Sequence, residues 1–75
     1  MSHAYIEGRL FDVKTTKELP FGEYDKCTFK GLNFSNLDVS QYIFTDCEFI
    51  DCNLSLVKVR HTAFRKVKFE GCKIM

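Results

Sequence analysis

Four cysteines are the residues of this 75-residue chain that are best suited to metal or redox chemistry. They are separated along the sequence by 20, 5 and 20 residues, and they are Cys27, Cys47, Cys52 and Cys72. Zinc sites usually contain close cysteine pairs with two to four intervening residues, but the spacings of 5 and 20 here equal the periods of a sequence repeat. The spacing of Cys47, Cys52 and Cys72 therefore does not predict a metal site, and its regularity asks for another explanation.

Acidic and histidine side chains offer the other candidates for chemistry. Asp46, Glu48 and Asp51 form an acidic cluster that could imitate an acid–base pair, but general acid–base catalysis requires a pocket that shifts pKa values. His3 and His61 have no nearby nucleophile and no second histidine with which to form a ligand set. The chain contains no glycine-rich phosphate loop and no G-x-S-x-G motif. We predict no catalytic, cofactor-binding or metal-ligating residues, and no enzymatic activity.

Length and composition limit the classes of protein to which the chain can belong. The chain is long enough for a single domain, with 45% hydrophobic and 28% charged residues and a net charge of +1. No apolar run is long enough to cross a membrane, and the first residues lack the features of a signal peptide. We expect a cytoplasmic protein that does not bind membranes.

An unbroken five-residue repeat runs from residue 26 to residue 75. The fourth position of every pentad is large and apolar, and the second position is hydrophobic in every pentad except the one with Thr62. The fourth-position residues are Phe29, Phe34, Val39, Phe44, Phe49, Leu54, Val59, Phe64, Phe69 and Ile74. The second-position residues other than Thr62 are Cys27, Leu32, Leu37, Tyr42, Cys47, Cys52, Val57, Val67 and Cys72. A period of five fits neither an α-helix nor a continuous strand, so the chain must turn a corner in each pentad.

Four corners close a square coil of about twenty residues, and successive coils stack at the interstrand spacing of about 4.8 Å. The segments DCEFIDCNLS and HTAFRKVKFEGCKIM resemble the pentapeptide-repeat family. This resemblance covers residues 26–75 and implies an all-β, right-handed quadrilateral β-helix of about two and a half coils. The family prefers small residues at the positions of Leu32, Leu37 and Tyr42, so these three imply a widened or distorted first coil.

Residues twenty apart should lie directly above one another in this fold. The register predicts interior columns of Phe29, Phe49 and Phe69, and of Phe44 and Phe64. It places Cys27 beside Cys47 and Cys52 beside Cys72, where they serve as small buried hydrophobes. Disulfides within these pairs are sterically conceivable, but a cytosolic protein is not expected to form them. On the outside, the register pairs Asp38 with Lys58, Asp46 with Lys66, and Glu48 with Lys68.

The two ends of the repeat differ. Residues 1–25 are predicted to form a cap that contains a strand or a short helix, entered through Pro20 and Gly22. Its covering side chains would come from Tyr5, Ile6, Leu10, Phe11, Leu19 and Phe21. The last pentad, GCKIM, provides no polar cover for Phe64, Phe69 and Ile74. We therefore expect either an end-to-end homodimer or the continuation of a longer solenoid beyond this end.

The predicted function is that of a non-catalytic scaffold or protein-interaction module with an unknown protein partner. Ile43, Ile50 and Leu56, the outward apolar residues, are expected to contact the N-terminal segment or a partner. The resemblance implies one alternative, a DNA mimic that binds DNA gyrase, which would need a long acidic rod. This repeat has eight bases, five acids and a height of about 12 Å, so the alternative is disfavoured. Nucleic-acid binding by the basic run 58–73 is not expected either, because the neighbouring coil offers acids to the same lysines.

Overall fold

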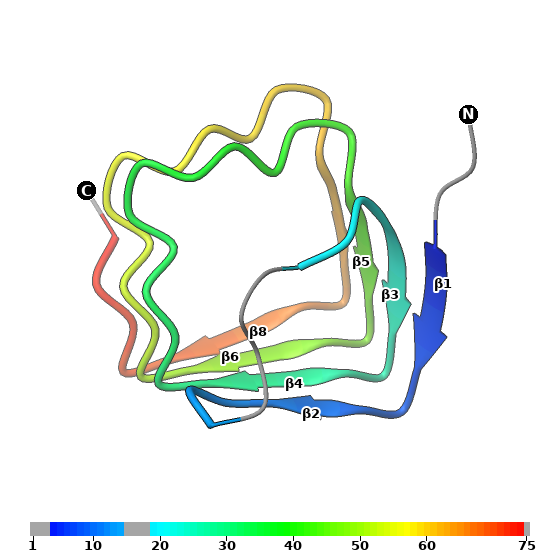
Figure 1. Cartoon of the computed structure of the whole chain (residues 1–75), viewed down its shortest axis with the longest axis horizontal. Coiled ribbons are helices and arrows are strands. Elements are labelled where there is room, and N and C mark those ends of the chain that lie inside the picture. Colours follow the sequence, from blue (N-terminus) through cyan, green and yellow to red (C-terminus); the bar gives the residue numbers. More distant parts are fainter. Residues whose placement is uncertain (1–3, 15–18, 75) are drawn as a thin grey trace.

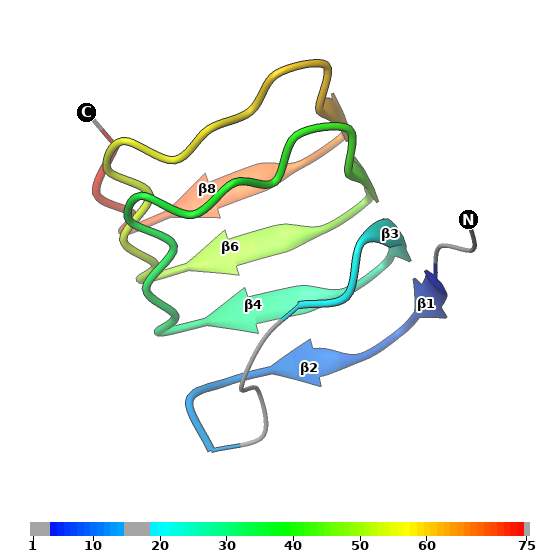
Figure 2. The same ribbon diagram turned by 45° about the horizontal axis from the view of Figure 1, so that its top comes forward.

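The structure, a computed structural model, describes residues 4–14 and 19–74. Within these ranges the chain forms short strands and no helix, and it winds as a square coil (Figure 1). The path runs clockwise in Figure 1. Figure 2, turned so that the top comes forward, shows the later strands above the earlier ones, which means that they lie farther from the viewer of Figure 1. The coil is therefore right-handed. The strands are β1 (Ala4–Glu7), β2 (Leu10–Phe11), β3 (Gly22–Asp25), β4 (Thr28–Lys30), β5 (Ile43–Thr45), β6 (Glu48–Ile50), β7 (Ala63–Arg65) and β8 (Lys68–Glu70).

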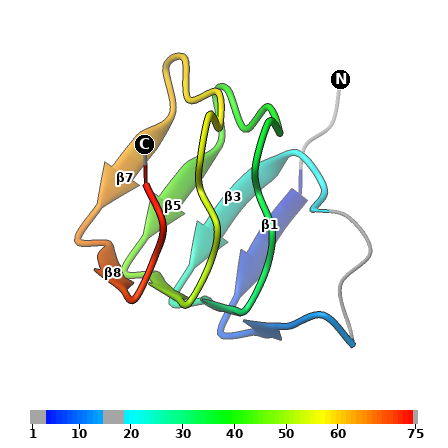
Figure 3. The same cartoon turned by 90° about the vertical axis from the view of Figure 1, so that its left-hand side faces the viewer.

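Two sides of the square are parallel sheets, in the orders β1-β3-β5-β7 and β2-β4-β6-β8. Figure 3 shows the strands of the first sheet side by side. From β3 onward each strand pairs with the strand twenty residues later, so that Phe29 faces Phe49 and Phe49 faces Phe69. The other two sides are held by single bridges, Asn33 to Asn53 to Lys73 and Asp38 to Lys58. The predicted fold and its twenty-residue register are confirmed.

The corners are made by the first residue of every pentad. All ten of these residues have a positive φ, between 52° and 68°. This is the left-handed backbone region, which residues other than Gly, Asn and Asp rarely adopt. They are Lys26, Gly31, Asn36, Gln41, Asp46, Asp51, Leu56, His61, Lys66 and Gly71. The chain therefore turns at one residue in five, where the backbone enters the left-handed region.

Aromatic columns fill the interior. Phe29 stacks on Phe49 with ring centroids 4.7 Å apart, and Phe49 stacks on Phe69 at 5.3 Å. Phe44 stacks on Phe64 at 5.5 Å. Neighbouring columns meet edge to face, as Phe29 and Phe44 do with their rings at 86°. The arrangement combines both favourable geometries for aromatic pairs, so the columns contribute beyond the area that they bury.

The N-terminal segment continues both sheets as strands. β1 pairs with β3 and β2 pairs with β4 at an offset of eighteen residues instead of twenty. The reason is that Phe11 and Tyr24 are thirteen residues apart, whereas the equivalent pair one coil later, Phe29 and Phe44, is fifteen apart. Figure 2 shows β2 below β4 and β1 beside β3. Phe11 is buried and stacks on Phe29 with centroids 5.1 Å apart. Tyr24 stacks on Phe44, so the regular register begins before residue 26. The division of the chain at residue 25 stays a prediction.

Two tyrosine hydroxyls hold the chain that enters β3. The hydroxyl of Tyr24 donates to the carbonyl of Pro20, and that of Tyr42 donates to the carbonyl of Leu19 at 2.8 Å. Of the predicted covering residues, Phe11 is buried and Ile6 and Leu19 pack against the core. Tyr5, Leu10 and Phe21 are instead 59%, 57% and 45% exposed. Tyr5 and Leu10 lie at outward positions of their alternating strands, whereas Phe21 meets Tyr42 edge to face at 5.4 Å.

The irregular pentads differ in how they place their large second residue. Leu32 is buried and Tyr42 is half-buried, but Leu37 is 48% exposed. Leu37 belongs to a side whose bridge, Asp38 to Lys58, runs only toward the following coil. Val39, on the same side, is buried, so the inward pattern produces burial there but not at Leu37.

Leu56 provides a test of the corner geometry. It is 66% exposed and has φ 58°, whereas Asn36 occupies the same corner one coil earlier with φ 62°. A left-handed conformation costs about 1–2 kcal/mol for a residue such as leucine and less for asparagine. We expect Leu56→Asn to raise the free energy of unfolding by about 1 kcal/mol, measured by urea denaturation.

The matched control is Gly31→Ala, at a corner with φ 67° and open space around the missing Cβ. We expect this change to lower stability by a similar amount, since only backbone strain is added. An unchanged or lowered urea midpoint for Leu56→Asn would contradict the role assigned to the corner.

Candidate functional site

The last coil leaves its apolar interior open. Phe64 and Phe69 are 41% and 44% exposed, whereas Phe44 and Phe49, one coil earlier in the same columns, are 1% and 2% exposed. The side chains are identical and occupy the same register, so the difference comes from the coil that covers the earlier pair. Among residues 4–14 and 19–74, nothing covers the later pair. The expected lack of cover over Phe64, Phe69 and Ile74 is confirmed for the described residues.

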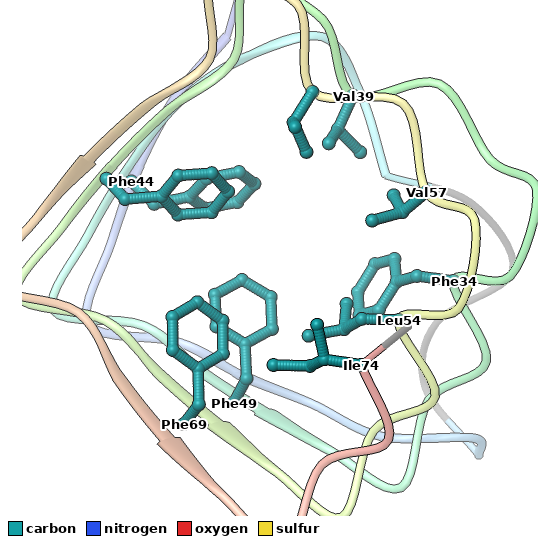
Figure 4. Close-up of a pocket in the computed structure, with 10 residues that line it drawn as sticks. Phe34, Val39, Phe44, Phe49, Leu54, Val57, Phe69 and Ile74 are labelled. Carbon is teal, nitrogen blue, oxygen red and sulfur yellow. The ribbon is translucent and has the colours of Figure 1, made fainter.

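A cavity of about 280 Å³ opens at this end. Figure 4 shows Phe44 on one side of it, Phe49 and Phe69 on a second, and Leu54 and Ile74 on a third. The lining is entirely apolar: Phe34, Val39, Phe44, Phe49, Leu54, Val57, Val59, Phe64, Phe69 and Ile74. A volume of this size approaches the lower range of ligand pockets and admits one or two large side chains.

The backbone around this cavity ends in free strand edges. Ala63 and Lys68 donate their amides back to the carbonyls of Tyr42 and Cys47. In a parallel strand, the backbone N–H and C=O groups of successive residues point alternately to the two neighbouring strands. The amides and carbonyls of Phe64 and Phe69 therefore face away from β5 and β6. One coil earlier, the amide of Asp46 donates forward to Arg65. Its equivalent at Lys66 has no following strand to meet among the described residues.

Charge is distributed unevenly between the last two coils. Residues 35–54 carry four acids and no base: Asp38, Asp46, Glu48 and Asp51. Residues 55–74 carry one acid, Glu70, and six bases: Lys58, Arg60, Arg65, Lys66, Lys68 and Lys73. Glu48 and Lys68 are register partners, and Asp38 bridges to Lys58. The last coil, which contributes to the lining of the cavity, therefore carries an excess of exposed bases, and we define its six basic residues as the basic rim.

The charges of the last coil affect the pKa of Asp38 in the coil before it. Its pKa is lowered, mainly because Ser40 donates hydrogen bonds to the carboxylate, including one from its amide at 2.9 Å. Lys58 and Arg60 of the following coil lower the pKa further. Part of the basic rim is thus neutralised by the coil on which it stacks.

The cysteines lie where the register predicts. Cys27, Cys47 and Cys52 are buried, Cys72 is half-buried, and all four are free thiols. Burial raises the pKa of the Cys47 thiol to about 11 and also raises that of Cys52. Each Sγ points at a carbonyl of the preceding coil, as Cys72 does at the carbonyl of Phe49, 3.1 Å away. Among the described residues, no three Cys, His, Asp or Glu side chains are grouped as a metal site would require.

The remaining candidates lie outside the cavity. Asp46, Glu48 and Asp51 are exposed on the outer surface, and His61 is an exposed corner residue with φ 59°. His3 lies outside the described residues. Ile43 and Ile50 are half-buried, whereas Leu56 is exposed, and a partner contact for these three stays a prediction. The sequence interpretation did not single out Val57 or Val59 as cavity residues, although both occupy apolar columns of the repeat.

The fold and the open interior define a class of repeat protein, a β-solenoid whose coils contact only their neighbours. The family model described as "Pentapeptide repeat region" matches residues 23–75, and the chain belongs to this family. The family supports the interpretation of a non-enzymatic repeat protein. A search of curated proteins finds no match. No helix in the described part of the chain has the length and apolarity to cross a membrane.

The covering of the columns can be measured with a matched pair of variants. Phe49 is covered on both sides, so Phe49→Ala should cost about 3–5 kcal/mol of unfolding free energy. Phe69→Ala, in the same column at the open end, should cost less than half as much. Chemical denaturation measures both variants, and equal losses would show that the last coil is covered in solution.

Thiol reactivity gives an independent measure of the open end. Cys72 is half-buried, whereas the thiol groups of Cys47 and Cys52 are buried and have raised pKa values. We expect iodoacetamide at pH 8 to alkylate Cys72 well before these two, because alkylation needs an accessible thiolate. Mass spectrometry of peptides from a time course gives the order, and modification of Cys47 first would contradict this assignment.

Proposed function

We propose that this protein is a non-catalytic interaction module that binds a partner protein end-on, through the open face of its last coil. The occupant is a segment that adds one short strand beside β7 and another beside β8, with a bend between them, and inserts apolar side chains into the cavity. The observation that carries the proposal is the 280 Å³ apolar cavity bordered by two free strand edges. Strand addition to an open edge is a common mode of peptide recognition.

The alternation of a strand suits this face. Inward side chains of an added strand would continue the columns of Phe64 and Phe69, and its backbone would meet the amides that face the open edge. Burial of large apolar side chains supplies the affinity, at about 25 cal/mol per Å² removed from water. The DNA-mimic alternative gains no support, because the repeat region carries a net charge of +3.

The test uses the neutral peptide TFQNVQFQNV, whose two Phe residues match the register of Phe64 and Phe69. We expect amide chemical-shift changes at β7, β8 and Ile74 when the peptide is titrated up to about 1 mM, the range of weak strand addition. Phe69→Glu should abolish these changes, while Leu10→Glu, at an exposed residue of β2, should leave them intact. Absence of shifts at the open end would overturn the proposed function.

A further inference from the structure

We infer that the segment bound at the open end is acidic on its outward side, so that the partner is an acidic-edged strand of a different protein. This inference rests on the proposed function and adds the chemistry of the partner. Its basis is the register between the basic rim and the coil beneath it. The register shows which rim charges are already matched and which are not.

Three residues of the basic rim have no acid in register one coil earlier. Arg65 faces Thr45, and Lys73 bridges to Asn53. Arg60 lies twenty residues after Ser40. In contrast, Lys58 and Lys68 are in register with Asp38 and Glu48. The coil beneath therefore neutralises only part of the rim, and the excess positive charge borders the open edge.

The same charge argues against a second copy as the occupant. A two-fold dimer through this face would bring two rims of six bases and one acid each against one another. Like charges directly opposite on adjacent strands are destabilising. An acidic segment instead repeats on the free side the arrangement that already exists on the other side, where acidic Glu48 adjoins Lys68.

Leu56 adds a second observation at the same coil. It is 66% exposed and has a left-handed backbone, although Asn36 shows that a suitable residue fits this corner. An exposed leucine with an unfavourable φ gains nothing from the fold in the described chain. It places an apolar side chain on the outer surface of the last coil.

Three peptides in the register of residues 63–72 test the inference. The acidic peptide TFEDVEFKNV places acids opposite Arg65, Lys66 and Lys68, and a lysine opposite Glu70. The neutral peptide is TFQNVQFQNV, and the reversed peptide is TFKKVKFENV. We expect the acidic peptide to bind about tenfold more tightly than the neutral one at low salt, as three exposed ion pairs allow. The reversed peptide should bind more weakly than the neutral one.

Salt and charge reversal identify the source of the difference. Raising the salt concentration should bring the acidic peptide to the affinity of the neutral one, since exposed pairs are screened. Arg65→Glu should reduce the preference for the acidic peptide, because it turns one of the three ion pairs into a repulsion. Lys30→Glu, at an exposed residue of β4 two coils away, should retain the preference in full. An undiminished preference in Arg65→Glu would overturn the assignment to the rim.

The outcomes separate this inference from the proposed function. Equal, Phe69-dependent affinity for all three peptides would leave the end-on docking in place and overturn the acidic partner. Failure of every peptide to shift the amides of β7 and β8 would overturn both. A dimer of the free protein in light scattering, broken by Phe69→Glu, would make a second copy the occupant and overturn the inference.

Discussion

Stacking of each coil on the next, twenty residues later in the chain, is the constraint on which the whole structure depends. It requires that one residue in every pentad take a left-handed backbone, because a different turn angle at any corner would shift all later side chains out of their columns. The left-handed backbone has a free-energy cost at Lys26, Gln41, Leu56 and other corners. This cost is offset by the aromatic columns, in which Phe29, Phe49 and Phe69 lie at centroid separations near 5 Å.

A fold of this kind is stabilised by neighbours along one axis, so its two ends present separate physical problems. At the N-terminal end, residues of the same chain cover the apolar columns. Phe11 covers Phe29, and the hydroxyls of Tyr24 and Tyr42 hold the segment at Leu19 and Pro20. At the other end the described residues offer no equivalent. The cavity and the free edges of β7 and β8 lie where the apolar columns reach the last described coil.

The period of five predicts most of the fold because each inward residue is constrained by two neighbours in its column. The pairing of Phe29, Phe49 and Phe69 and the placement of the cysteines followed from counting alone. The eighteen-residue offset of β1 and β2 did not, because a shortened crossing between Phe11 and Gly22 leaves the apolar pattern of the repeat unchanged. The exposure of Leu37 was not predicted either, because the hydrophobic type of a residue does not by itself determine its burial, as the buried Val39 on the same side shows.

Inward positions of a solenoid are determined by packing, so they say little about what the protein binds. Information about partners resides in the outward residues that the stack itself does not explain. Glu48 and Lys68 have opposite charges and lie in register on adjacent strands, so their charges are matched within the protein. Arg65 and Lys73 face Thr45 and Asn53, so no acid of the preceding coil, within the part of the chain that the structure describes, is in register with either charge. The open columns and these two charges occur in the same coil, and a single acidic, alternating segment satisfies both because its inward and outward side chains alternate.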